Sequence, residues 1–164
     1  MKPSAIVYES NTGFTARYAK MLGAATGLPV YRLSDNSLPK DTAVIFCSWL
    51  IAGRIRRYRR AFRRYNLRAV CAVGLCGTGM LLQEVRRAVR IPEQIPLFTL
   101  QGGMDHGGLK GIYRSMIQTL IKMLSKKKNP SDEEREILQM IRQGGDFVRE
   151  ENLSAVLEWW ETPC

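Results

Sequence analysis

The chain of 164 residues carries 25 lysines and arginines against 15 aspartates and glutamates, which gives a formal net charge of +10 at pH 7. A hydrophobic content of 45% with no low-complexity tract excludes a disordered chain, and the length predicts one domain spanning residues 1–164. The charge attracts anions of any kind, so nucleic acid, an acidic membrane face and an anionic small molecule all stay open as partners.

Apolar runs alternate with helical patterns along the chain, which is typical of a parallel sheet with crossover helices. The first run begins at residue 4, so close to the N-terminus that a secretory leader is not expected, and this favours a cytoplasmic protein. Residues 43–52 are the most apolar window, but ten residues are too few to cross a bilayer. We expect buried strands at residues 4–8, 29–33, 42–48, 67–74 and 95–100.

Helical spacing of apolar residues fills most of the segments between and after these strands. The first helix follows strand 4–8 and is expected to stop at Gly27. Segment 54–64 has one apolar stripe and is otherwise rich in arginine. Ser131 and Glu134 form the capping-box pattern that opens a later helix. Further helices are expected at about 81–89, 109–124, 131–143 and 153–160.

The turn after the first strand is polar and lacks lysine; it consists of Ser10, Asn11, Thr12, Gly13, Phe14 and Thr15. Ligands of open parallel sheets bind at the carboxyl ends of the strands, where this turn is expected. Its N–H groups and hydroxyls, with the following helix N-terminus, suit a phosphate without any formal charge. Triphosphatase and dinucleotide motifs are both missing. The pattern predicts a site for one monophosphate ester, or else a polar turn that only caps the helix.

Eight positions of this region match the flavodoxin signature: Ile6, Val7, Tyr8, Ser10, Gly13, Thr15, Ala19 and Leu22. The chain resembles the flavodoxin-like family over nearly its full length. It is most similar to the branch that contains menaquinone-dependent protoporphyrinogen dehydrogenase, which shares a Gly- and Asp-containing loop and an extra helix after strand five. The resemblance implies a three-layer α/β sandwich, a five-stranded parallel sheet of order 2-1-3-4-5, helices on both faces, and non-covalent flavin mononucleotide (FMN).

The resemblance also implies a second flavin loop, at residues 47–53. It corresponds to the family's loop beside the isoalloxazine ring, so Trp49 would stack on the ring and Gly53 would supply a flexible peptide near N5. Ser48 and Leu50 belong to the same loop. Trp49 is equally well explained as an ordinary core or interface aromatic.

A third loop, at residues 101–108, corresponds to the family's loop at the pyrimidine edge of the flavin. There the N–H groups of Gly102 and Gly103 would meet the ring carbonyls, with Asp105 nearby. His106 is the only histidine, so an imidazole metal site is not expected, and an exposed loop histidine is the default interpretation. The cysteines lack the close spacing of zinc or redox motifs and are interpreted as buried or otherwise unreactive thiols: Cys47, Cys71, Cys76 and Cys164.

The basic charge distinguishes this chain from electron-carrier flavodoxins, which are generally acidic. Arginines beside the second flavin loop would favour anionic reduced flavin and raise its redox potential: Arg54, Arg56, Arg57 and Arg59. This favours an FMN-dependent oxidoreductase, with a quinone-linked dehydrogenase of a porphyrinogen-like or other anionic substrate as the hypothesis. The same arginines, or helix 109–128, could contact an anionic membrane peripherally at its inner face.

Two alternatives stay open. The first is a soluble electron carrier of the same fold, which would pass electrons to a redox partner without turning over a substrate. The second is a flavin-free scaffold that binds nucleic acid or protein through its basic surface, although no nucleic-acid-binding signature accompanies the charge. The sequence indicates neither catalytic residues nor an oligomeric state.

Overall fold

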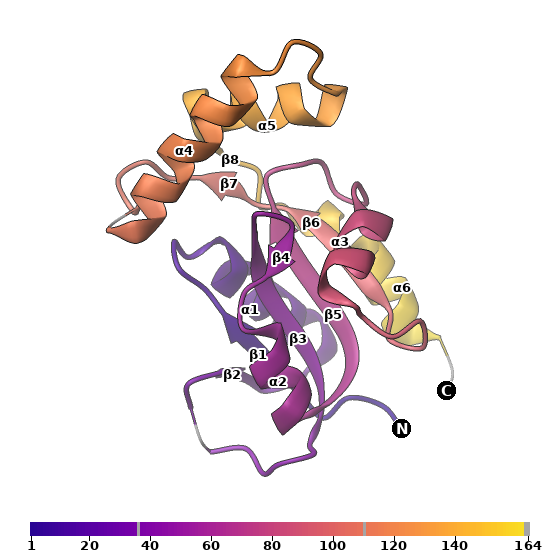
Figure 1. The fold of residues 1–164 in the computed structure, drawn as a ribbon. Helices are drawn as coiled ribbons and strands as arrows, with labels where there is room; N and C mark the ends of the chain where they lie inside the picture. Colours follow the sequence, from indigo (N-terminus) through magenta and orange to yellow (C-terminus); the bar gives the residue numbers. More distant parts are fainter. Residues whose placement is uncertain (36, 110, 163–164) are drawn as a thin grey trace.

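A parallel sheet forms the centre of the computed structural model, which describes residues 1–35, 37–109 and 111–162. Its main strands are hydrogen-bonded in the order β2-β1-β3-β5-β6, and every pairing among them is parallel. The predicted α/β class is thereby confirmed (Figure 1). The strands are β1 (Ala5–Glu9), β2 (Val30–Arg32), β3 (Ala43–Ile51), β5 (Asn66–Gly74) and β6 (Leu97–Gln101).

The sheet differs in detail from the predicted one because a sixth strand, β4 (Arg54–Ile55), turns back antiparallel to β3. Strand β3 extends to Ile51, beyond the predicted end at residue 48. Ala52 and Gly53, which link the two strands, both have positive φ, as type I′ hairpin turns require. The segment expected to be a flavin loop, 47–53, is therefore mainly strand, and only its last two residues form a turn.

Helices cover both faces of the sheet, as predicted. On one face lie α1 (Phe14–Thr26) and α6 (Ser154–Glu161), which follows the short 3₁₀ helix η1 (Glu150–Leu153). On the other lie α2 (Tyr58–Arg64) and α3 (Leu82–Val89) (Figure 1). Helix α2 begins later than segment 54–64 predicted, because the start of that segment is used by β4.

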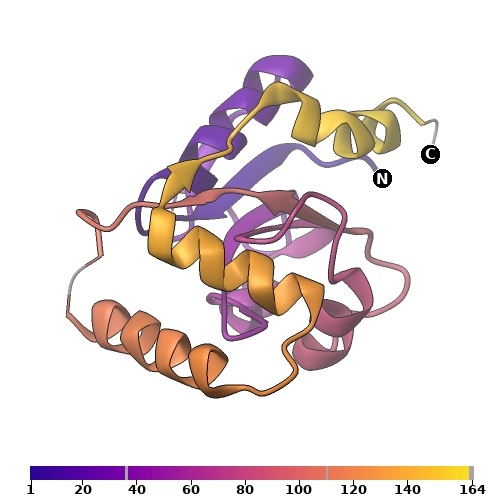
Figure 2. The same cartoon turned by 90° about the horizontal axis from the view of Figure 1, so that it is seen from above.

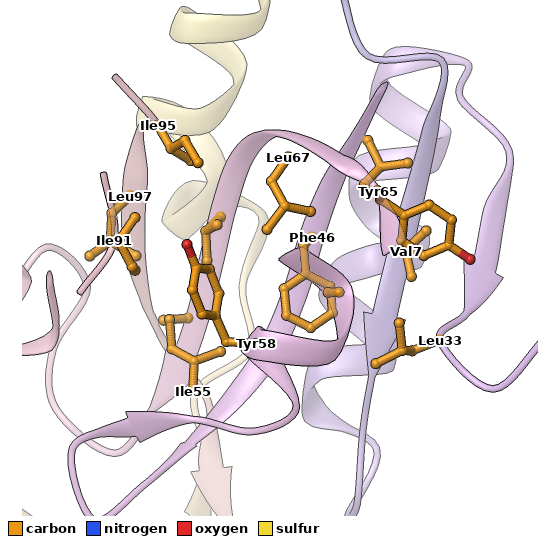
Figure 3. Close-up of a cluster of buried hydrophobic side chains, with 14 of the residues drawn as sticks. Val7, Leu33, Phe46, Ile55, Tyr58, Tyr65, Leu67, Ile91, Ile95 and Leu97 are labelled. Carbon is orange, nitrogen blue, oxygen red and sulfur yellow. The ribbon is translucent and has the colours of Figure 1, made fainter. Parts of the chain in front are cut away.

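Each face of the sheet has its own buried cluster. Under α2 and α3, Phe46 is fully buried among Val7, Tyr58 and Leu67 (Figure 3). Under α1 and α6, Tyr18 is fully buried as well. Both faces of β3 are thus covered, which explains why its sequence is continuously apolar rather than alternating.

The hydroxyl of Tyr18 connects three separate parts of the chain. It donates a hydrogen bond to the carbonyl of Gln101 at the end of β6 and accepts one from the side-chain amide of Asn152 in η1. Burial raises the pKa of this phenol above 10.0. The contact fixes α1 against the end of β6 and the start of the C-terminal segment.

A helical hairpin stands over the carboxyl ends of the strands (Figure 1). It consists of α4 (Ile112–Lys126) and α5 (Asp132–Gln143). Two short antiparallel strands, β7 (Gly103–Met104) before α4 and β8 (Gly145–Asp146) after α5, connect it to the rest of the domain. The two helices lie side by side when the molecule is seen from above (Figure 2). A third, smaller apolar cluster fills the hairpin base, including Met140 and Ile141.

The predicted capping box at the start of α5 is present. The N–H of Glu134 donates to the hydroxyl of Ser131 at 3.2 Å, and the N–H of Ser131 donates to the Glu134 carboxylate at 2.9 Å. These two bonds satisfy donors that the helix itself leaves without partners, so they fix where α5 begins. Within the described ranges, no helix is both long and apolar enough to pass through a bilayer.

Candidate ligand-binding site

A pocket of about 390 Å³ lies between the carboxyl ends of the strands and the α4–α5 hairpin. Pockets that hold small organic ligands have volumes of about 300–1,000 Å³. The strand order reverses between β1 and β3, and open α/β sheets bind ligands in the crevice at such a reversal. The pocket is therefore in the position where this architecture places a ligand.

The turn between β1 and α1 forms the polar end of the pocket. All of its predicted residues line the cavity except Gly13: Ser10, Asn11, Thr12, Phe14 and Thr15. Gly13 instead shapes the turn, because its φ of +98° is one that other residues rarely adopt, and its N–H donates to the Ser10 hydroxyl at 3.2 Å.

The start of α1 is suited to an anion. It has no side-chain cap and no acidic residue in its first turn. The N–H groups of that turn have no partner within the helix, and the helix dipole adds partial positive charge there. Among the described residues that line the pocket there is no lysine or arginine, so the groups that could contact an anion at this end are neutral donors. The guanidinium of Arg32 donates to the Ser10 carbonyl at 3.4 Å.

The β3–β4 hairpin forms one wall. Trp49, Leu50 and Gly53 line the pocket as predicted, but Ser48 does not, since it is fully buried and its hydroxyl donates to the Arg56 carbonyl at 2.8 Å. Ser48 therefore holds the hairpin rather than a ligand. This correction arises because residue 48 is still part of strand β3 and not part of a loop.

Trp49 already has an aromatic partner in the structure. Its ring meets that of Tyr113 from α4 edge to face, with 5.2 Å between centroids and 74° between planes. Its indole N–H is buried without a hydrogen-bond partner, which is uncommon because a buried donor of this kind usually finds one. Trp49 thus carries an unused donor within the pocket wall.

The loop after β6 contributes Gly103 and Asp105 to the pocket, but not Gly102. The N–H of Gly102 donates to the Gly74 carbonyl at 2.8 Å, so it is not free to meet a ring carbonyl as expected. The carboxylate of Asp105 accepts the N–H of Gly107 at 2.9 Å. His106 is exposed, in agreement with the default interpretation.

The apolar end of the pocket was not predicted. It is formed by the inner side of the helical hairpin and by the loop between β5 and α3. The helix expected at residues 109–124 was recognised, but a role for it in lining a pocket was not. The residues missed in these two segments include one charged side chain, Glu134, and otherwise Leu75, Cys76, Gly77, Met80, Leu81, Leu109, Tyr113, Ile117, Leu120, Leu124 and Ile137.

The arginines lie around the pocket rather than in its lining. The Arg56 guanidinium is 6.0 Å from the centroid of the Tyr113 ring, and Arg57 is paired with Glu9 at 3.5 Å. Arg54 and Arg59 are exposed. Over residues 1–35, 37–109 and 111–162, no group of three or more histidine, cysteine or acidic side chains is placed to hold a metal ion.

Cys76 lines the pocket, and we expect it to be an unreactive thiol. Burial, followed by the charges of Glu136 and Glu133, raises the pKa of its thiol from 9.0 to about 11. Since only the thiolate is nucleophilic, alkylation at pH 8 should be about 100-fold slower than for an ordinary cysteine. The measurement is the iodoacetamide rate at Cys76 as a function of pH in a Cys164→Ser background. A rate that levels off near pH 9 would contradict the assignment.

The structure brings together all the predicted site residues except Gly13, Ser48 and Gly102 around one pocket. Searches against protein-family models and against curated proteins find no significant match to the chain. The sheet order and the helices on both faces are compatible with a flavodoxin-like fold. Membership of that family is therefore a proposal, supported by residue pattern and fold.

Proposed function

We propose that the chain is a flavodoxin-like, FMN-binding oxidoreductase. The observation that carries the proposal is the convergence of three chain segments on one pocket: the lysine-free polar turn after β1, the Trp49 hairpin, and the Gly103 loop. When the short antiparallel β4 is set aside and the five parallel strands are numbered along the chain, their order in the sheet is 2-1-3-4-5. This is the flavodoxin-like order.

The pocket fits FMN in its chemistry. One end presents hydroxyls and the start of α1, which suit a phosphate monoester. The rest is mainly apolar and includes a large aromatic, which suits a flat ring system, although the carboxylates of Asp105 and Glu134 also line it. The Gly102 N–H is not available for this role, so fewer backbone donors face the ring than the family pattern implies.

In this proposal the chain binds and orients the cofactor, and the cofactor supplies hydride or electron transfer. Ser10, Thr12 and the first turn of α1 would hold the phosphate, and Trp49 would flank the ring. The apolar wall from the hairpin would exclude water from the ring and leave room beside it for a substrate or redox partner. Arg54 and Arg56 would favour an anionic substrate and an anionic reduced flavin.

The substrate is proposed to be a porphyrinogen-like or other anionic molecule, with a quinone as electron acceptor and the cytoplasm as the location. A soluble electron carrier of the same fold would differ from this enzyme in one respect: it would be reduced stoichiometrically without turning over a substrate. A flavin-free basic scaffold would not take up FMN and would instead bind DNA with steep salt dependence.

We expect FMN to bind at least about 100-fold more tightly than riboflavin, because only FMN presents a dianionic phosphate to the donors at the start of α1. Replacing Thr12 with alanine should weaken FMN binding about tenfold, the value of one hydrogen bond to a charged group, and leave riboflavin binding unchanged. Quenching of flavin fluorescence during titration measures both affinities. Thr42→Ala is the matched control, since Thr42 lies at the opposite end of the sheet and its hydroxyl donates to the Pro39 carbonyl, far from the pocket. Equal affinities for FMN and riboflavin would reject the phosphate site.

A further inference from the structure

Helix α4 exposes a row of large apolar side chains. Ile112 is 71% exposed, Met123 65% and Met116 39%. Residues four and seven positions apart lie on the same side of a helix, so the three form one stripe, hereafter the outer stripe. No residue of α4 is fully buried, so these side chains are left uncovered by the rest of the described chain.

Basic side chains border the outer stripe. Lys122 and Lys126 are exposed and lie one turn apart beside Met123, and Arg114, Lys127 and Lys128 are exposed on the same segment. There is no aspartate or glutamate between residues 112 and 128. Lys127 is engaged by Glu134 at 2.6 Å, whereas Lys122 and Lys126 form no ion pair with any described residue. Their charge is therefore available to an external anion.

The outer stripe is continuous with the pocket wall. The neighbouring row of α4 consists of Tyr113, Ile117, Leu120 and Leu124, which line the pocket. Met116 has Tyr113 three residues before it and Leu120 four residues after it, so the two rows are adjacent on the helix surface. One side of the apolar sector of α4 thus faces the cavity and the other faces outward.

We propose that α4 is an interfacial helix that docks on the surface of an anionic lipid bilayer. The outer stripe enters the boundary between headgroups and acyl chains, while Lys122 and Lys126 bind lipid phosphates. A nucleic acid would neutralise the lysines but leave the apolar stripe in water. A second copy of the chain would cover the stripe, but its own α4 would offer these lysines no acidic partner, because residues 112–128 contain no aspartate or glutamate. The proposal does not depend on flavin.

Co-sedimentation with vesicles of phosphatidylglycerol and phosphatidylcholine tests the proposal with the full chain. The wild type should sediment with the mixed vesicles and should stay in the supernatant when the vesicles are pure phosphatidylcholine. Ile112→Gln with Met123→Gln should weaken partitioning about 100-fold, because two exposed apolar side chains no longer leave water. Lys122→Gln with Lys126→Gln should weaken it about 30-fold. Both pairs are exposed, so circular dichroism spectra should stay unchanged.

Matched controls lie on α2, whose last turn is at the opposite end of the sheet from α4 (Figure 1). Phe62→Gln removes another exposed apolar side chain, and Arg60→Gln with Arg63→Gln removes the same amount of charge. Both should bind vesicles like the wild type. If the double charge variants on α2 and on α4 lose vesicle binding equally, the attraction depends on net charge alone and the proposal is overturned. The proposal is also overturned if the α4 variants lose DNA binding or self-association while their vesicle binding is unaffected.

Discussion

Replacing Phe46 with alanine is expected to lower the free energy of unfolding by about 3–5 kcal/mol, the range for a fully buried phenylalanine. Phe46 is completely inaccessible to solvent, at the centre of the cluster between the sheet and helices α2 and α3 (Figure 3). Its removal leaves a cavity that neighbours on two rigid layers cannot close. Since a domain is stable by only about 5–15 kcal/mol, a large part of the total would be lost.

Urea unfolding followed by circular dichroism measures this change as a lower midpoint with an unchanged slope. Phe62→Ala is the matched control, because Phe62 is 46% exposed on α2, where its ring centroid lies 5.6 Å from that of Tyr58. This substitution should lower the free energy of unfolding by less than about 1 kcal/mol. Equal losses at the two positions would mean that the cluster under α2 and α3 is not a packed core.

The sheet and its covering helices were largely predictable because local signals and tertiary packing agree. Strand β3 is continuously apolar because both of its faces are covered, and α1 stops at Gly27, whose positive φ closes the helix with an N–H bond to the Gly23 carbonyl. At α5, the capping box specifies the first residues independently of the rest of the molecule. Such features depend on neighbours in sequence, so the sequence alone reveals them.

The parts that were not predicted depend on contacts between distant residues. Strand β4 has only two residues and follows from pairing with β3, and β7 and β8 pair across the whole hairpin. The apolar stripe of α4 was visible in the sequence, but periodicity cannot say whether a stripe covers a sheet or a cavity. Likewise, the neighbouring sequence does not distinguish Gly102, whose N–H donates to the Gly74 carbonyl, from a glycine with a free N–H.

Gly103→Ala is expected to destabilise the protein by about 3 kcal/mol, because the site needs the space that a glycine leaves. A Cβ at Gly103 would lie 2.2 Å from the Gly145 carbonyl oxygen and 3.0 Å from the Phe14 ring. The first contact is with the backbone of β8, which cannot rotate away. The φ of Gly103 is not in the left-handed region, so crowding rather than backbone conformation causes the effect.

This variant separates two explanations of the glycine. If Gly103 served only to present its N–H to a ligand, alanine would keep that N–H, and neither stability nor FMN affinity would change. If the glycine instead allows β7 to pack between β8 and Phe14, alanine displaces the base of the hairpin, and both the stability and the FMN affinity decrease. Gly77→Ala is the control, since a Cβ at this pocket-lining glycine would meet two flexible side chains, Met80 at 3.1 Å and Glu136 at 4.0 Å. This variant should lose less than about 1 kcal/mol of stability. Chemical unfolding and FMN titration of both variants decide between the two explanations.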